Sequence, residues 1–365
     1  MIEIVHECLA NTLAERGGQP YEPGRTLLIN STHGVIDGCC YLVFGRNTAT
    51  PKYIVKSART EAGKEIYGIE YRNLQLLQRE GMNAERANTP EPIGMWERNG
   101  MLITAQSALP GKLLANLPSD GVFAADTIDR TLDSLFEWWR RFHGKLGVQR
   151  VSVTAEVYEK EVLGLLSRYR ARFLPGTAEE GLLDRRLERE RRLLDRELPF
   201  MALHGDFVAA NMMLDPSGIS VFDWEFPLVH QLPLFDLFVF FGSFRFPRTE
   251  GGEDSHFSRF QSVYWGHGAV STAVQGRLLA TCDEFGLARE LLGDLFLLAL
   301  LRQANMKYDA MLTANGLTEE SRATKEDGWQ LLHHPDMNTP LARIHDGVYE
   351  NIRYVADQGL PSFVA

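Results

Sequence analysis

Cysteine is scarce in this chain of 365 residues. The four that occur are Cys8, Cys39, Cys40 and Cys282, and no two of them form a CxxC pair. Cys39 and Cys40 are neighbours, and neighbouring cysteines rarely bridge each other. This usage excludes a disulfide framework and a structural zinc site of the CxxC type. We therefore expect a reduced protein of the cytoplasm.

Long apolar runs are also missing. The longest, "LPLFDLFVFFGSF" (232–244) and "LLGDLFLLALL" (291–301), are too short to span a bilayer, and each contains an aspartate. The first residues, "MIEIVHECLANTLAERGG", are amphipathic and acidic, whereas a signal peptide begins with basic residues and an apolar run. We therefore expect the two runs to be buried helices, and we expect no membrane partner.

The chain has no excess of positive charge, because its net charge is -10. Residues 201–365 hold 11 basic and 21 acidic side chains, and the rest is nearly balanced. A nucleic-acid binder normally shows a basic face, so no nucleic-acid partner is expected. The run "DRRLERERRLLDRE" (184–197) mixes both signs and is typical of a solvated helix face.

The order of local patterns predicts two lobes. β-rich runs separated by turn residues come first, and helical periodicity dominates later. The predicted elements are strands at 25–30, 39–46 and 52–58, a helix at 61–81, a hairpin at 91–108, and helices at 131–146, 157–174 and 182–198. With a break at "LPGK" (109–112), this order predicts an α+β, bilobal fold. Residues 1–110 form a small β-rich lobe with one main helix, and residues 111–365 form a larger, mostly helical lobe.

Two short stretches carry the chemistry, "HGDFVAANMMLD" (204–215) and "FDWEF" (222–226). Phosphoryl transfer needs a carboxylate to orient the acceptor hydroxyl, oxygen ligands for magnesium and a cation on the phosphates. Asp206 suits the first task. Asn211 and Asp223 offer the hard oxygen ligands that Mg²⁺ prefers.

The spacing D-x-x-x-x-N, followed by a hydrophobic-Asp pair in "VFDWE", resembles the protein-kinase-like superfamily. The closer resemblance is to its aminoglycoside phosphotransferase and choline kinase-like branch, which reads HGDxxxxN and then a DW-type metal motif. The resemblance implies a kinase-like bilobal fold, with Asp206 as catalytic residue and Asn211 and Asp223 on magnesium. Asp236 is then expected to hold the catalytic-loop backbone. For His204 we expect packing and hydrogen bonds to that loop.

The positively charged side chain that contacts the phosphates is expected to come from the small lobe. Lys56 ends the strand "YIVKSA" and resembles the phosphate-binding lysine of the superfamily. Glu70 lies on the otherwise apolar face of the helix that follows, where a carboxylate needs a buried partner. Glu61 and Glu65 are rival partners, but they lie near the helix start, where the helix dipole favours acids in any case.

Nucleotide-binding segments are expected at two further places. The loop between the first two strands contains Gly34 and Gly38 but no GxGxxG, and there Ser31 and Thr32 contact phosphate or simply form a hairpin turn. Because the loop lacks the GxGxxG pattern of protein kinases, the choice between ATP and GTP stays open. A hinge that holds the purine by backbone hydrogen bonds is expected at Gln106–Leu109, with Gln106 and Ala108 as contacts.

The acceptor is expected to be a small molecule. Gly205 stands where protein kinases carry the arginine of HRD, and only twelve residues separate Asp223 from Asp236, too few for a regulated activation loop. The acidic excess after residue 200 favours a cationic acceptor bound by the helices after 240. An acceptor with a neutral sugar or nucleoside hydroxyl is the alternative. For Glu225, both a metal contact and a salt bridge remain open.

The sequence thus predicts an ATP- and Mg²⁺-dependent phosphotransferase acting on a hydroxyl of an aminoglycoside, amino alcohol or sugar-like molecule. Two alternatives are a catalytically inactive nucleotide-binding pseudokinase, used as a scaffold, and a kinase acting on a glycan. A pseudokinase usually lacks one of the four central residues. All four, Lys56, Asp206, Asn211 and Asp223, are present. The oligomeric state is left open.

Overall fold

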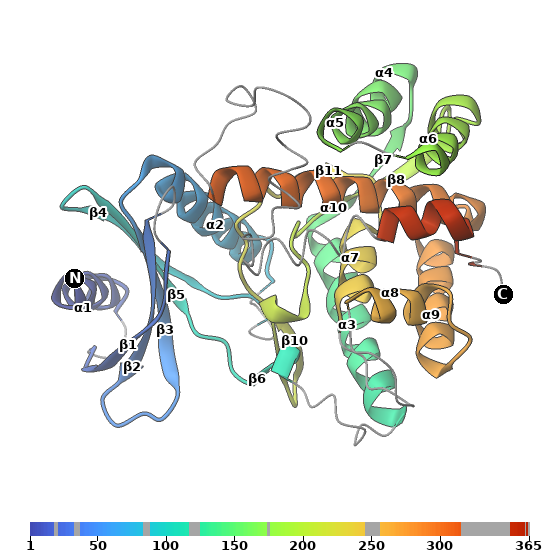
Figure 1. The fold of residues 1–365 in the computed structure, drawn as a ribbon. Helices are drawn as coiled ribbons and strands as arrows, with labels where there is room; N and C mark the ends of the chain where they lie inside the picture. The colour runs from blue at the N-terminus through green and yellow to red at the C-terminus, as the bar shows by residue number, and fades with distance from the viewer. Residues whose placement is uncertain are drawn as a thin grey trace.

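The structure is a computed structural model that describes residues 1–17, 21–32, 37–82, 88–116, 125–173, 176–244, 256–314, 351–361 and 363. Figure 1 shows a sheet-containing lobe built from the first part of the chain beside a larger lobe built mostly from helices. The predicted α+β, bilobal fold class is therefore confirmed. The division at residue 110 stays a prediction.

The small lobe is a five-stranded antiparallel sheet with one helix on each side. Strand order is β1-β2-β3-β5-β4, so the last hairpin is inserted next to β3. Its elements are α1 (Ile2–Glu15), β1 (Pro23–Thr32), β2 (Gly38–Gly45), β3 (Pro51–Ala58), α2 (Glu61–Arg79), β4 (Pro92–Arg98) and β5 (Met101–Ser107).

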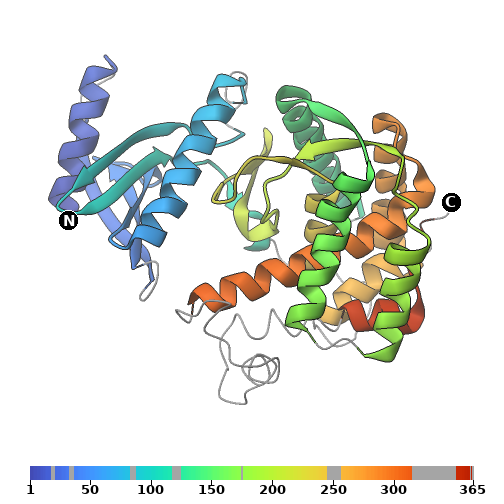
Figure 2. The same cartoon turned by 90° about the horizontal axis from the view of Figure 1, so that it is seen from above.

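The two helices of this lobe pack against different parts of the molecule. Val5 and Leu9 of α1 complete the core of the sheet with residues such as Val43 and Ile103. Helix α2 lies between the sheet and the large lobe (Figure 2), and its buried Leu74 belongs to the large-lobe core. Because α2 is packed on both sides, its polar residues can be held in fixed positions at the junction.

The large lobe combines helices with two small antiparallel sheets, ordered β10-β9-β6 and β11-β8-β7. Its elements are β6 (Lys112–Leu113), η1 (Leu114–Asn116), α3 (Ala125–Leu146), β7 (Val148–Ser152), α4 (Ala155–Tyr158), η2 (Glu159–Leu163), α5 (Gly164–Arg172), α6 (Thr177–Leu183), η3 (Asp184–Arg189), β8 (Glu197–Ala202), η4 (Ala209–Asn211), β9 (Met212–Asp215), β10 (Gly218–Val221), β11 (His230–Gln231), α7 (Phe235–Ser243), α8 (His256–Tyr264), α9 (Ala269–Phe285), η5 (Arg289–Leu291) and α10 (Leu292–Ala314), followed by a helix at 351–358.

The apolar runs form the centre of this lobe. Almost every residue of α7 is buried, as is the first half of α10. Within the described ranges, no helix is long and apolar enough to cross a membrane. Trp138 stacks on Phe142 and Phe207 and lies beside Trp224, so α3 packs directly against the segment that follows β10.

The helix predicted at 182–198 is only partly correct. The helical segment ends at Arg189, and β8 begins at Glu197. Arg191 and Asp195 adopt positive φ values of 44° and 59°, which stop a right-handed helix. The backbone N–H of Asp195 instead donates to the carbonyl of Val153, so the chain turns to pair with the strand after α3. Tertiary pairing overrides a strong local helix pattern here.

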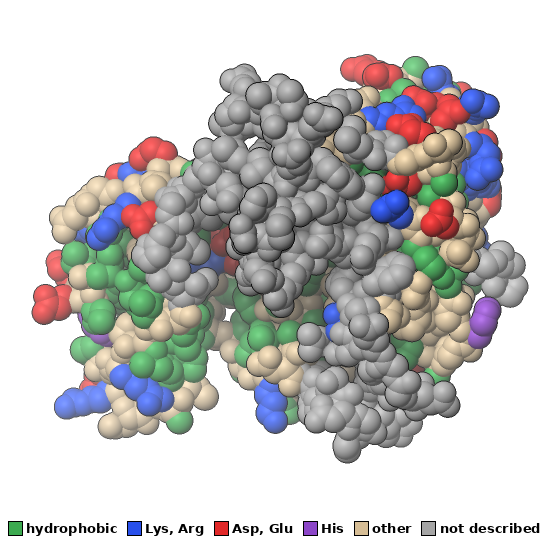
Figure 3. Space-filling view, in the orientation of Figure 1, with side chains coloured by type: hydrophobic (Ala, Val, Ile, Leu, Met, Phe, Trp, Pro, Cys, Tyr) green, Lys and Arg blue, Asp and Glu red, His purple; other side chains and the backbone are tan. Residues whose placement is uncertain are grey.

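The mixed-charge run was expected to form a solvated face, and the structure shows ion pairs along it, one of which joins Arg186 to the buried Asp294 at 2.8 Å. Arg186 pairs with Glu190 at 2.9 Å, and Arg170 pairs with both Glu180 and Glu188. Figure 3 shows blue and red side chains interspersed over this corner of the molecule, near α5 and α6. Exposed pairs of this kind contribute little stability, and they leave no basic face there.

Candidate active site

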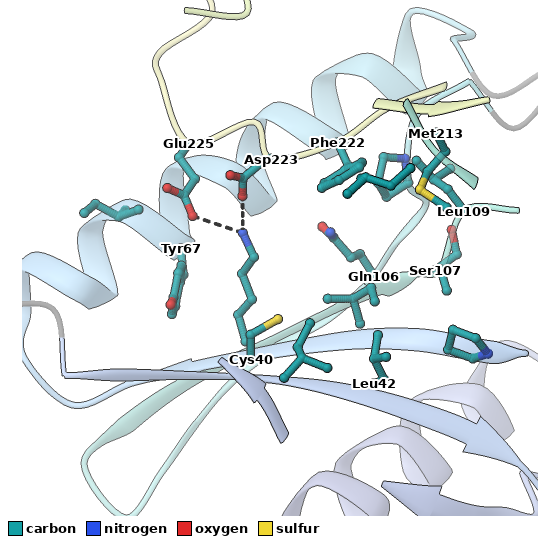
Figure 4. A pocket seen from close by; sticks show the side chains of 18 residues that line it. Cys40, Leu42, Tyr67, Gln106, Ser107, Leu109, Met213, Phe222, Asp223 and Glu225 are labelled. Carbon is teal, nitrogen blue, oxygen red and sulfur yellow. Dashed lines mark hydrogen bonds and ion pairs between the residues drawn. The ribbon is translucent and has the colours of Figure 1, made fainter. Parts of the chain in front are cut away.

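A pocket of about 590 Å³ opens between the lobes and is lined by both. Strands β2 and β3 supply apolar side chains such as Leu42 and Ile54, and the large lobe supplies Met213 and Phe222 (Figure 4). An apolar slot between two walls suits a flat aromatic base, because burial of apolar surface is the main driving force for such binding.

One end of the pocket carries a cluster of charges around Lys56. The Lys56 Nζ lies 2.8 Å from a carboxylate oxygen of Glu70, 2.6 Å from Asp223 and 3.0 Å from Glu225. Figure 4 shows Asp223 and Glu225 facing the pocket, with the dashed contacts to this lysine. The contact between Lys56 and Glu70 that the sequence suggested is thus present, and the same ammonium group joins the two lobes.

The cluster contains more negative than positive charge. Burial alone would lower the pKa of Lys56, but the three carboxylates outweigh it and hold that pKa well above its usual value. Burial, against the attraction of Lys56 and with repulsion from Asp223 and Glu70, raises the pKa of Glu225 to about 7. Burial likewise raises the pKa of Glu70. Two negative charges thus stay uncompensated when all three carboxylates are ionised.

The segment after β10 is shaped to present Asp223. Asp223 adopts a φ of 71°, in the left-handed region that aspartate tolerates better than most residues. Trp224, its neighbour, is fully buried and donates from its indole nitrogen to the Val221 carbonyl at 3.1 Å. Because the indole of Trp224 is buried inside the lobe, the side chains of its neighbours Asp223 and Glu225 face the pocket.

Asn73 ties this segment to helix α2. Its amide nitrogen donates to the carbonyls of Trp224 and Phe226, at 2.8 and 2.7 Å. Asn73 lies one helical turn after Glu70, so a single stretch of α2 holds both Lys56 and the backbone beside Asp223. This role could not be predicted from the sequence, because an asparagine within a helix has no local pattern that indicates a partner 151 residues away.

Asp236 holds the backbone of the loop 203–211 by hydrogen bonds. Its buried carboxylate accepts hydrogen bonds from the backbone N–H groups of His204 and Gly205, at 2.7 and 3.1 Å. His204 is fully buried; its Nε2 lies 2.9 Å from the Phe222 carbonyl and its Nδ1 3.3 Å from the backbone nitrogen of Asp206. Both residues therefore make the structural contacts that were expected of them.

The other face of the loop presents Asp206. The Asn211 side-chain amide donates to the backbone and side-chain oxygens of Asp206, both at 2.9 Å. The backbone N–H of Phe222 donates to the Asn211 carbonyl at 3.0 Å, which links the loop to the strand leading to Asp223. Lys307, from α10, lies 4.0 Å from the Asp206 carboxylate and was not foreseen.

Gly205 is required by both backbone and space. Its φ is +90°, and a Cβ there would lie 2.8 Å from the Cβ of Phe226. Neither an arginine nor any other side chain fits at this position without displacing Phe226. This explains in physical terms why the chain reads HGD.

Of the residues predicted to bind the nucleotide, some line the pocket and others do not. Gly34 lies outside the described residues, and the side chains of Ser31 and Thr32 are not described. Gly38 begins β2 and does not line the pocket. Gln106 and Ala108 both line it, but the Ala108 backbone N–H already donates to the Lys52 carbonyl at 2.8 Å.

A divalent cation fits the charged end of the pocket. In the described part of the chain, Glu70, Asp223 and Glu225 each offer an oxygen, and these oxygens lie within 4.8 Å of one another. Carboxylate oxygens are the ligands that Mg²⁺ prefers, and the cluster holds three carboxyl groups around a single ammonium group. Glu70 is only 2% exposed, whereas Asp223 and Glu225 are about one-third exposed, so Asp223 and Glu225 are the more accessible of the three.

Comparison with known families gives one decisive match. Residues 41–268, well over half of the chain, match the model of a family described as the phosphotransferase enzyme family. The chain belongs to this family. The resemblance to aminoglycoside phosphotransferases stated from the sequence is therefore confirmed, as is the enzyme class, a phosphotransferase with an alcohol group as acceptor. At this coarse level the protein is a small-molecule kinase.

Solved structures of similar shape are distant in sequence. An aminoglycoside phosphotransferase from Streptomyces rimosus is 14% identical, with 83% of this chain and 98% of that chain covered and a TM-score of 0.44. A spectinomycin phosphotransferase in complex with ADP and its antibiotic is 14% identical, with 96% and 98% covered and a TM-score of 0.45. A putative fructosamine-3-kinase from Thermobifida fusca is 16% identical, with 81% and 99% covered and a TM-score of 0.41. No curated protein matches the chain.

Proposed function

We propose that this protein transfers the γ-phosphate of ATP, with Mg²⁺, to a hydroxyl group of a small molecule. In this proposal residues 1–110 bind the nucleotide, and residues 111–365 carry the catalytic loop, the metal ligands and the acceptor pocket. The observation that carries the proposal is the position of Lys56. Its ammonium group lies at the end of an apolar pocket and joins Glu70 of one lobe to Asp223 of the other.

The purine lies in the apolar slot between β2 and Met213. Its polar edge meets the hinge at Gln106–Leu109. The N–H of Ala108 is used within the protein, whereas the N–H of Leu109 makes no hydrogen bond to any residue that the structure describes. Leu109 also lines the pocket. We assign the purine hydrogen bond to this N–H, one residue after the position expected from the sequence.

The phosphates lie at the charged end. Lys56 contacts them, and Glu70 keeps the ammonium group in place. Asp223 supplies the charged metal ligand and Asn211 a neutral one. The amide nitrogen of Asn211 is held by Asp206, while its Oδ1 accepts no hydrogen bond from the described residues and stays available. Mg²⁺, when bound, neutralises phosphate charge and orients the transferred group.

Asp206 acts on the acceptor. Its carboxylate is about one-third exposed, and Asn211 fixes one of its oxygens at 2.9 Å. The other oxygen can accept a hydrogen bond from the acceptor hydroxyl and take its proton as the new P–O bond forms. Because Asp236 and His204 fix the loop backbone, the carboxylate is positioned before the substrate arrives.

The test is ADP release by the purified protein with Mg-ATP or Mg-GTP and a panel of hydroxyl compounds that includes aminoglycosides, amino alcohols, sugars and nucleosides. Acceptor-dependent ADP release that needs Mg²⁺ and is lost in Asp206→Asn supports the proposal. Tight Mg-ATP binding without turnover on any acceptor would favour the inactive nucleotide-binding scaffold. Absence of Mg-ATP binding would reject the proposal.

A further inference from the structure

A second pocket, of about 220 Å³, lies on the large lobe between α10 and the helical segment made by η2 and α5. One wall is a single face of α10, with Arg302, Asn305 and Asp309 at helical spacing, and the opposite wall includes Glu161 and Arg168. The volume equals that of about seven water molecules, enough for a molecule of monosaccharide or amino-acid size.

This pocket is next to the catalytic loop. Lys307, which lies 4.0 Å from the Asp206 carboxylate, directly follows the pocket residue Met306 on α10. Gln231 of the pocket pairs with Met201, in the strand β8 that leads into the loop. Helix α10 therefore contributes residues both to this pocket and to the surroundings of Asp206.

Two arginines of the pocket make no ion pair within the described part of the chain. Arg168 makes no hydrogen bond or ion pair with any residue that the structure describes. Arg302 makes only a stacking contact, its guanidinium carbon 4.6 Å from the centre of the Phe235 ring. Burial lowers the pKa of Arg302, Asp236 and Glu161 raise it, and repulsion from Arg168 lowers it further. Both guanidinium-bearing side chains line the same pocket.

The acids of the pocket are already paired. Asp309 pairs with the buried Arg172 at 2.7 Å, and Glu161 pairs with Lys160 at 3.2 Å. Asn305 accepts from Arg172 and donates to the Leu165 carbonyl. The amide of Gln231 and the guanidinium groups of Arg168 and Arg302 remain for a ligand, and guanidinium groups bind carboxylate and phosphate oxygens particularly well.

We propose that the acceptor molecule carries an anionic group, a carboxylate or a phosphate ester, which binds between Arg168 and Arg302 while its hydroxyl faces Asp206. This deepens the proposed function and rests on it. It also departs from the cationic acceptor expected from the acidic excess of residues 201–365, because the acids beside this pocket are neutralised by neighbours within the protein.

The first experiment tests the anion site without using catalysis. Thermal unfolding of the full chain is followed in sodium sulfate and in sodium chloride of equal ionic strength. Four proteins are compared: the wild type, Arg168→Gln, Arg302→Gln and the double variant. Arg185→Gln is the matched control, since Arg185 is exposed and likewise has no partner among the described residues. Sulfate stabilises most proteins by exclusion, so only differences between variants are informative.

The expected result is that sulfate, relative to chloride, raises Tm more for the wild type and Arg185→Gln than for the double variant, with the single variants between them. An equal sulfate response in all five proteins would overturn the proposal. This outcome is separate from a failure of the proposed function, because no nucleotide is present.

The second experiment identifies the anionic group. ADP release is measured with one scaffold in four forms: glucose, glucosamine, glucuronate and glucose 6-phosphate. We expect one of the two anionic forms to have the lowest KM, the carboxylate or the phosphate according to which is the better ligand. Arg302→Gln should raise that KM by about tenfold or more, with the KM for ATP unchanged. A lowest KM for glucose or glucosamine, unaffected by Arg302→Gln, would contradict the proposal.

Discussion

The two pockets to which the segment 203–236 contributes differ in the side chains that line them. The larger, between the lobes, is an apolar slot that ends in three carboxylates around Lys56. The smaller, beside α10, is lined by several charged side chains, and two of its arginines have no ionic partner among the residues that the structure describes. An apolar slot with an acidic end suits a base and a metal-bound phosphate chain. A cationic pocket suits a polar acceptor with negative charge. The donor and the acceptor thus meet opposite environments.

The largest expected effect comes from Asp206→Asn, which should abolish transfer while both pockets still bind. We expect turnover to fall on the order of 10²–10⁴-fold, as for loss of a general base. Calorimetry should show Mg-ATP affinity close to that of the wild type. Asp215→Asn is the control, since Asp215 only caps an exposed turn at Ser217. Near-normal turnover of Asp206→Asn would remove this residue from the catalytic role.

Asp223→Ala should affect the acidic pocket alone. Loss of the charged ligand should abolish the Mg²⁺-dependent part of nucleotide binding, measured by calorimetry with and without the metal. Glu225→Gln should have a smaller effect, because it removes one charge and keeps an oxygen ligand. The Tm response to sulfate should persist in Asp223→Ala. Unchanged Mg-ATP affinity in Asp223→Ala would show that the metal binds elsewhere.

Lys56→Ala should weaken nucleotide binding more than acceptor binding. A hydrogen bond to a charged group contributes about 1.5–3 kcal/mol, so KM for ATP should rise by roughly tenfold to a hundredfold. The KM for the acceptor should change little. Glu70→Ala should give the same pattern more mildly, because the lysine keeps its charge and loses only its anchor. Equal effects on both KM values would argue that Lys56 supports the fold rather than the phosphates.

The smallest effect concerns the link between the lobes. Asn73→Ala leaves the Trp224 and Phe226 carbonyls without their donor, and the free energy of unfolding should fall by about 1–3 kcal/mol. Nucleotide binding should weaken only slightly, since Lys56 still joins the lobes. Gln75→Ala, at an exposed position of the same helix, is the matched control and should change neither quantity. Equal unfolding free energies for both variants would contradict the role given to Asn73.

The sequence predicted the contacts that depend on local spacing. Asp206 and Asn211 were expected in one site because they lie five residues apart, and the structure places them together, joined by a hydrogen bond that was not itself predicted. The Lys56–Glu70 contact could be expected because a carboxylate on an apolar helix face needs a partner. The role of Asp236 was expected from the family resemblance, and its contacts with the backbone of His204 and Gly205 agree with that expectation.

What the sequence did not predict depends on tertiary packing. Lys307 approaches Asp206 from a helix a hundred residues further along, and nothing in its neighbourhood indicates this. The strand β7 is short and contains an arginine, so its pattern resembles a loop. The acidic excess after residue 200 was used to predict a cationic acceptor, but which acids stay unpaired is decided by their neighbours in space. Charge counts alone do not contain that information.

The central claim is that Lys56, Asn211 and Asp223 surround the phosphates and the metal of a bound nucleotide. A crystal structure with Mg²⁺ and a non-hydrolysable ATP analogue tests it most directly. We predict that the purine lies in the apolar slot against Leu109 and that the metal is bound by Asp223 and Asn211. The Lys56 ammonium should contact a phosphate oxygen while it keeps Glu70. A nucleotide bound outside this pocket, or a metal that contacts neither Asp223 nor Asn211, would contradict the account.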